Sequence, residues 1–155
     1  MRLIKVNLKN ITIDDYANAV AKLAELALTG TSGGRAAAQV ILSAYNGNNW
    51  QLDVTDLMVL DDDNYELAMA VINGRVQFRE EPHLLINNGA DVFKEIQKIW
   101  VRFHIANRWK SSCYDCEGRG VIYDEDDYDA DNPHECKSCK GSGLSDVVRK
   151  PPVFD

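Results

Sequence analysis

The chain has 155 residues, 45% of them hydrophobic, and a formal net charge of −7. This composition is sufficient for one compact core with a small appendage. No apolar run reaches membrane-spanning length, and residues 1–5 contain no apolar signal segment. We therefore expect a soluble, cytoplasmic protein without membrane contact. The acidic balance counts against nucleic-acid binding, because an acidic surface repels phosphate.

The acidic charge is concentrated at the C-terminal end. Residues 1–112 hold 12 basic and 13 acidic residues, whereas residues 113–155 hold 5 basic and 11 acidic residues. Together with the motifs below, this predicts three parts: a helical body with an N-terminal strand (1–110), a four-cysteine hairpin (111–145) and an extended tail (146–155). The expected fold class is mainly α, a small helical bundle.

Residues 2–13 alternate imperfectly between apolar and polar residues and are rich in β-branched side chains. This pattern predicts one extended strand. A single strand must find a partner, and three remain open: the cysteine hairpin, a short strand elsewhere, or a second copy of the chain, which would make a homodimer.

Two helices are expected next. Apolar residues at spacings of three and four predict a helix over 15–28, capped by Asp14 or Asp15. Residues 31–35 are glycine-rich but lack the order of a phosphate-binding loop, so we interpret them as an interhelical turn with a Ser or Gly cap. A second helix then covers 35–45.

The middle of the chain predicts a short helical turn and a third helix. Thr55 or Asp56 can cap the turn, whose apolar residues are expected to enter the core: Leu57, Met58 and Leu60. The aspartates at 61–63 are interpreted as the cap of a helix over 64–77. A divalent-cation site is the less favoured alternative, because carboxylates at a helix start usually meet its positive end.

The longest predicted helix covers residues 91–110 and has a broad apolar stripe. A solvated surface is the simplest interpretation of its opposite, basic face, and contact with an anionic partner, including nucleic acid, is the alternative. This face consists of Lys94, Lys98, Arg102 and Arg108.

Four cysteines occur as two short runs, each of the form CxxCxGxG. Cys113 and Cys116 form the first pair, Cys136 and Cys139 the second, with nineteen residues between the pairs. This spacing is typical of a four-cysteine structural zinc site, so we expect one structural Zn²⁺. A redox pair is disfavoured by the acidic neighbours, and disulfides by the lack of a secretory signal, while an iron–sulfur cluster stays open.

The CxxCxGxG repeat resembles the cysteine-rich domain of DnaJ-type co-chaperones over residues 113–143. That family carries four repeats and two zincs, whereas two repeats here can complete one site. The resemblance implies a zinc-clamped hairpin, with client binding as a holdase among the alternatives. No His-Pro-Asp tripeptide is present, so stimulation of a chaperone ATPase does not carry over.

The segment between the cysteine runs is acidic and contains tyrosines. Val121, Ile122 and Tyr123 fit the outgoing strand of the hairpin. The acidic residues match a calcium loop poorly, so we expect a surface that contacts a partner protein, because tyrosine is enriched at interfaces. The candidate contact residues are Tyr123, Asp124, Asp126, Asp127, Tyr128 and Asp129.

Residues 15–110 are similar to an uncharacterised family of small helical proteins found in phages and prophages. The similarity implies an accessory protein that binds and modulates a host protein, for example a defence or nucleic-acid enzyme, and it supplies no catalytic residues. Four thiolates would close the shell of a zinc ion, and no catalytic motif occurs elsewhere. The sequence therefore predicts a non-enzymatic binding protein.

Overall fold

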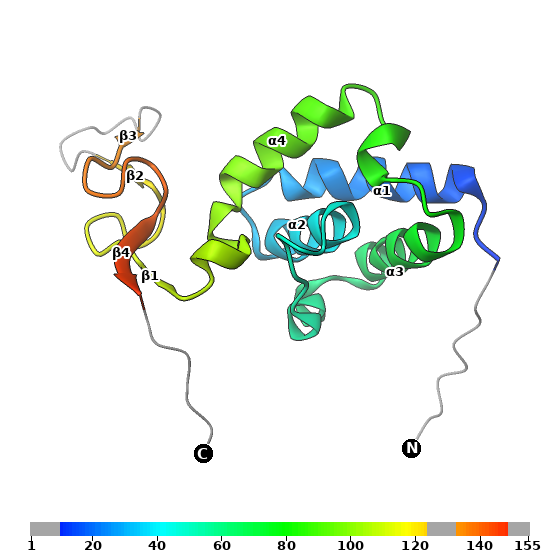
Figure 1. Ribbon diagram of the computed structural model, residues 1–155, viewed down its shortest axis with the longest axis horizontal. Helices are drawn as coiled ribbons and strands as arrows, with labels where there is room; N and C mark the ends of the chain where they lie inside the picture. The colour runs from blue at the N-terminus through cyan, green and yellow to red at the C-terminus, as the bar shows by residue number, and fades with distance from the viewer. Residues whose placement is uncertain (1–9, 124–132, 149–155) are drawn as a thin grey trace, which may run out of the picture. The chain divides into compact units, whose positions relative to one another are not determined.

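The computed structural model describes residues 10–123 and 133–148, and these residues are mainly helical (Figure 1). The predicted fold class is confirmed. The chain divides into two compact units, Met1–Ile99 and Trp100–Asp155. The boundary expected from the sequence, after residue 110, lies inside the second unit. Among the described residues, no helix combines the length and the apolar character needed to cross a bilayer.

Helix α1 (Ile13–Ala27) begins two residues earlier than expected, because Thr12 caps it. The Thr12 hydroxyl accepts a hydrogen bond from the Asp15 amide at 3.1 Å, and the Asp15 carboxylate accepts one from the Thr12 amide at 3.0 Å. This is a capping box with Asp15 as its third helical residue, rather than a cap by Asp14 or Asp15. The described end of the predicted strand, residues 10–12, is not a strand, and residues 1–9 lie outside the described part.

Helices α2 (Ser32–Tyr45) and α3 (Asp62–Phe78) both pack on α1. The glycine-rich stretch before α2 is an interhelical turn, as predicted, but its cap is Thr31, whose hydroxyl accepts from the Gly34 amide at 3.0 Å. Asp61 caps α3 and accepts from the Asn64 amide at 2.8 Å. The helix-cap interpretation of the aspartates at 61–63 is therefore confirmed.

The short 3₁₀ helix η1 (Val54–Val59) contains no buried residue. Its cap is Asp53, which accepts from the Thr55 amide at 3.0 Å, instead of Thr55 or Asp56. The expectation that its apolar residues enter the core is wrong. Met58 is 85% exposed, and Leu57 and Leu60 are only half-buried.

Helix α4 (Gly89–Ile99) follows the 3₁₀ helix η2 (Pro82–Leu85) and is shorter than predicted. In place of a helix up to residue 110, the chain forms two 3₁₀ turns, η3 (Val101–Phe103) and η4 (Ile105–Asn107). A 3₁₀ turn repeats every three residues, so the apolar spacing of the sequence continues past the true end of the helix.

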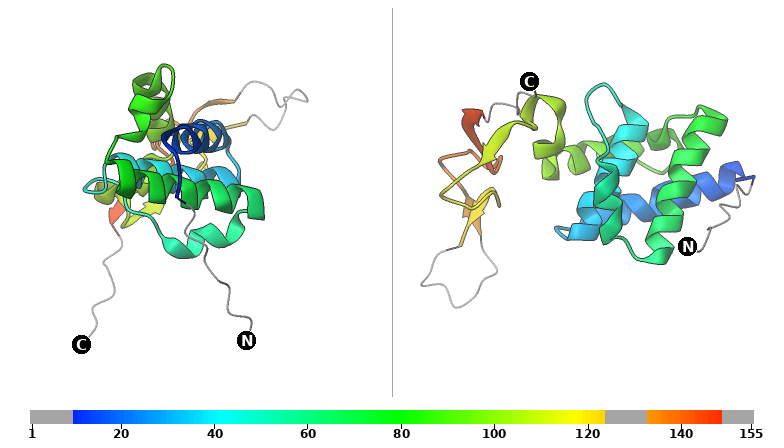
Figure 2. Two further views of the ribbon diagram at one scale, coloured as in Figure 1. Left: turned by 90° about the vertical axis from the view of Figure 1, so that its right-hand side faces the viewer. Right: turned by 90° about the horizontal axis from the view of Figure 1, so that it is seen from below.

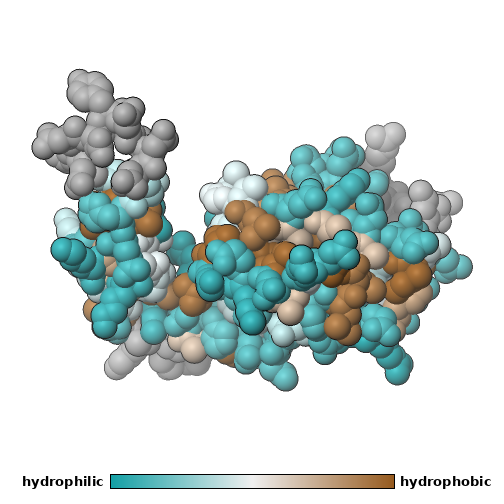
Figure 3. Space-filling view, turned by 90° about the horizontal axis from the view of Figure 1, so that it is seen from above, coloured by the Kyte–Doolittle hydropathy of each residue, from teal (hydrophilic) through white to brown (hydrophobic). Residues whose placement is uncertain are grey.

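The core of the first unit lies where α1 meets α2 and α3. Figures 1 and 2 show α1 between α4 on one side and α2 and α3 on the other. The α2 side of the core combines three alanines with larger apolar residues: Ala36, Ala37, Ala38, Val40, Ile41 and Leu42. Apolar residues also reach the surface of this unit, as the brown areas of Figure 3 show. The fully buried core residues include Tyr16, Val20, Leu23, Ala37, Ile41, Val71, Phe93 and Ile96.

The second unit contains two antiparallel strand pairs. Strand β1 (Lys110–Ser112) pairs with β4 (Leu144–Val148), and β2 (Val121–Ile122) pairs with β3 (His134–Glu135). The expected strand is confirmed for Val121 and Ile122, whereas Tyr123 lies just beyond its end. Of the tail predicted from residue 146, the part up to residue 148 belongs to β4, and the rest lies outside the described residues.

Candidate metal centre

The first cysteine run forms a tight turn between β1 and β2. The Gly118 amide donates to the Cys113 carbonyl at 3.1 Å, and the Arg119 amide donates to the Cys116 carbonyl at 2.9 Å. Glu117 takes a positive φ of 52°, followed by Gly118 at 84°. This conformation lets the Gly120 amide donate to the Cys116 sulfur at 3.2 Å.

The second run repeats the same turn between β3 and β4. Gly141 donates to the Cys136 carbonyl at 3.3 Å, and Ser142 donates to the Cys139 carbonyl at 3.1 Å. Lys140 takes a φ of 51°, and the Gly143 amide donates to the Cys139 sulfur at 3.2 Å. The two halves are therefore built alike, with a sulfur-directed amide at the second glycine of each.

The two turns also lock into each other. The Cys113 amide donates to the Gly143 carbonyl, and the Cys136 amide donates to the Gly120 carbonyl, both at 2.9 Å. A Cβ atom at Gly120 would overlap the Gly141 carbonyl oxygen, and one at Gly143 would overlap the Gly118 carbonyl oxygen. These glycines serve close approach as well as positive φ, which is a second reason for the CxxCxGxG spacing.

The four sulfurs converge on one point. Cys113 and Cys136 sulfurs are 3.9 Å apart, Cys116 and Cys139 sulfurs are 3.7 Å apart, and all four lie within 4.8 Å of one another. A tetrahedral ion with metal–sulfur bonds of about 2.3 Å requires sulfurs about 3.8 Å apart. All four cysteines are buried and unpaired by disulfides, and Ile122 packs against them. The group can hold a metal ion.

Hydrogen bonds and burial shift the pKa values of Cys113 and Cys116 in opposite directions. Burial opposes ionisation of Cys116, but bonds from the Gly120 amide and the neighbouring thiols outweigh it and lower the pKa of Cys116 to about 7. The amides of Cys116 and Asp115 lower the pKa of Cys113, but burial and the thiols of Cys116 and Cys136 raise it more strongly, to about 11. Metal binding must therefore displace protons from this cluster.

The remaining predicted contact residues are only partly described. Tyr123 directly follows β2 and is 45% exposed. The five other residues, Asp124, Asp126, Asp127, Tyr128 and Asp129, lie outside the described residues. Asp115 and Ser138, which no sequence motif marks as a site, are hydrogen-bonded to each other across the two turns.

The predicted basic helix face does not form one surface on one helix. Lys94 and Lys98 lie on α4 and pair with Asp91 and Glu95 at 3.9 and 3.1 Å. Arg102 and Arg108 lie after the end of α4, in the second unit. Helix periodicity was the reason for grouping the four residues, and it stops at Ile99.

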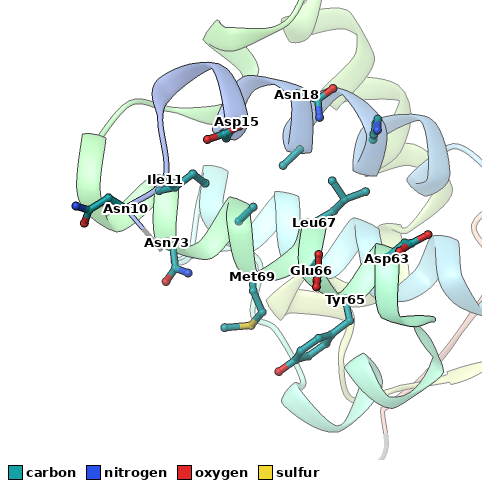
Figure 4. Close-up of a pocket in the computed structure, with 13 residues that line it drawn as sticks. Asn10, Ile11, Asp15, Asn18, Asp63, Tyr65, Glu66, Leu67, Met69 and Asn73 are labelled. Atoms are coloured by element: carbon teal, nitrogen blue, oxygen red, sulfur yellow. The ribbon is translucent and has the colours of Figure 1, made fainter. Parts of the chain in front are cut away.

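A groove of about 740 Å³ lies between α1 and α3 in the first unit (Figure 4). Its lining is mixed, with Asn18, Lys22 and Asn73 beside Leu67 and Met69. Asp15 on its wall is already held in the α1 capping box. Among the described residues, the four cysteines form the only group of three or more potential ligands close enough to share an ion. The groove therefore offers no comparable centre.

Comparison with known protein families decides where the chain belongs. A model described as a family of unknown function, DUF7673, matches residues 17–101, more than half of the chain. The chain belongs to this family. The DUF7673 match covers most of the helical unit and ends before Cys113, so the likeness to DnaJ-type repeats is carried by the cysteine motif alone. No curated protein and no solved structure gives a significant match.

Proposed function

We propose that this DUF7673 protein is a non-enzymatic protein-interaction module whose C-terminal unit is held together by one structural Zn²⁺. The observation that carries the proposal is the cluster of four buried sulfurs at tetrahedral spacing. All-thiolate sets of this geometry suit zinc, although an iron–sulfur cluster uses the same ligands. Strands β2 and β3 are each only two residues long, so the ion supplies most of what holds this unit together.

The closed shell supports a structural rather than a catalytic ion. A catalytic zinc keeps one position open for water or substrate, and four protein sulfurs leave none. The sulfurs are surrounded by the backbone amides of Gly120 and Gly143 and by the Ile122 side chain. None of these groups acts as a general acid or base. A binding function fits this surrounding better than a reaction does.

The proposed partner is a protein that docks on the acidic segment following Tyr123. Tyr123 is exposed and directly follows β2, so it is available for contact. The negative charge of the segment favours a basic surface on the partner. The resemblance to phage proteins suggests a host protein as that partner.

Affinity capture tests this proposal. A variant in which Asp124, Asp126, Asp127 and Asp129 become Asn should lose the captured protein, because the charge attraction is removed. The matched control neutralises four carboxylates of the helical unit instead, Asp14, Glu25, Asp91 and Glu95. Equal capture by both variants and the unchanged protein would reject the acidic segment as the contact.

Nucleic-acid binding is the rival function, and salt separates the two. Phosphate contacts weaken steeply as salt rises, so a mobility shift that disappears between low and physiological salt would favour the rival. Nucleic-acid binding is disfavoured because the four basic residues do not belong to one unit. Lys94 and Lys98 lie in the first unit, and Arg102 and Arg108 lie in the second.

A further inference from the structure

We propose that η1 and its flanking carboxylates form a second docking surface, on the helical unit, for a basic amphipathic helix of a partner protein. We call this the η1 surface and define it by Val54, Met58, Val59, Asp61, Asp62 and Asp63. It is separate from the four-cysteine unit and does not depend on a bound metal.

The first observation is that η1 displays apolar side chains to solvent. Met58 is 85% exposed, Val54 is 69% exposed and Val59 is 41% exposed, on a segment with no buried residue. Figure 1 shows this short helix, between α2 and α3 in the chain, standing out from the helical layer. Neighbouring exposed apolar side chains of this kind mark interaction sites, and methionine in particular adapts to different partners.

The second observation is that polar contacts hold η1 in this orientation. Gln39 of α2 is only 2% exposed, and its amide group donates to the Asp56 carboxylate and accepts from the Asp53 amide at 3.0 Å. Arg35 forms an ion pair with Asp56 at 3.3 Å. The buried Gln39 side chain thus fixes the polar side of η1 to α2. The apolar side of η1 is left facing outward.

The third observation is charge, and it selects the occupant. No Lys, Arg or His occurs between Arg35 and Arg75, while residues 53–66 contain six carboxylates. Asp61, Asp62, Asp63 and Glu66 are all exposed. Such a surface repels nucleic acid and anionic lipid, and it complements an apolar stripe bordered by Lys or Arg. A basic amphipathic helix has this combination.

The test uses the full-length protein, isotopically labelled, and a synthetic amphipathic helix made only of leucine and lysine. On addition of the peptide, the largest changes in amide chemical shift should occur at residues 53–63. Raising the salt concentration should weaken peptide binding. The same peptide with glutamate in place of lysine should not bind. Largest shifts at the α1–α3 groove or in the four-cysteine unit would overturn the proposal.

Two variants separate specific docking from general charge attraction. Met58→Gln should weaken peptide binding about tenfold or more, as expected for a contact at the centre of an interface. Val76→Gln is the matched control, because Val76 is also an exposed apolar residue, at 75%, and should change binding less than about twofold. An equal effect of both variants contradicts the proposal. The proposal is also contradicted if the unchanged protein self-associates without peptide and Met58→Gln does not. A second copy of the chain would then be the occupant of the η1 surface.

Discussion

Gly74 lies where α3 crosses the Tyr16 ring of α1. A Cβ atom at position 74 would overlap the ring carbons of Tyr16, which is fully buried. The structure gives Gly74 a packing role, since the close approach of α1 and α3 depends on the missing side chain.

Replacing Gly74 by alanine should therefore destabilise the helical unit. We expect the free energy of unfolding to fall by about 1–3 kcal/mol, the usual cost of overpacking a core. Gly33→Ala is the control, because its nearest side-chain neighbour is 3.7 Å away and alanine favours helix by up to about 1 kcal/mol. Urea unfolding measures both. Similar stability of the two variants would contradict the close contact.

Tyr16 should also make stability depend on alkaline pH. Burial raises its pKa to about 12, and its hydroxyl donates to the Glu80 carbonyl at 3.0 Å. The unfolded tyrosine ionises near pH 10.0, before the folded one. Stability is thus retained below pH 10 and falls as pH rises towards 12, because only the folded state keeps the proton.

Tyr16→Phe isolates this effect. At neutral pH the variant loses one hydrogen bond, about 0.5–1.5 kcal/mol. Between pH 10 and 12 its stability should decline less than that of the unchanged protein. Urea unfolding at each pH measures the stability of both proteins. An equal loss of stability in both would show that Tyr16 is not the group responsible.

At the scale of elements, the paired cysteine turns depend on their interlocking glycines. Gly120 has a φ of 78° and no space for a Cβ atom beside Gly141. Gly120→Ala should separate the two turns and weaken zinc retention by at least about tenfold, measured by competition with a chelator. Arg119→Ala, one residue earlier, removes an exposed ion pair to Glu117 and a hydrogen bond to the Cys116 carbonyl. It leaves the contact between the two turns in place and should retain zinc. If both retain zinc equally, the turns do not need this contact.

The cysteine turns could be predicted from sequence because their geometry is local. Residues three to five apart determine where each sulfur points, and glycine permits the required φ. The end of α4 could not be predicted, because Trp100 and Phe103 continue the apolar spacing without a Gly or Pro to mark Ile99 as the last residue. The exposure of Met58 was missed for a different reason. It follows from Gln39, fifteen residues before η1, which ordinary patterning gives no reason to bury.

At the scale of the whole molecule, the two units should respond differently to metal removal. The core of Met1–Ile99 contains no cysteine, and that of Trp100–Asp155 is centred on four of them. A chelator should unfold the second unit and leave the helical circular dichroism and the thermal transition of the first unit unchanged. Hydrogen exchange resolves the two units. A general loss of protection in α1 to α4 would contradict their independence.

The most direct measurement of the central claim is metal content combined with X-ray absorption at the zinc edge, on freshly purified and reduced protein. We expect one zinc per chain, with four sulfur neighbours at about 2.3 Å. A metal content well below one per chain, an iron signal in place of zinc, or nitrogen or oxygen neighbours in the first shell would contradict it.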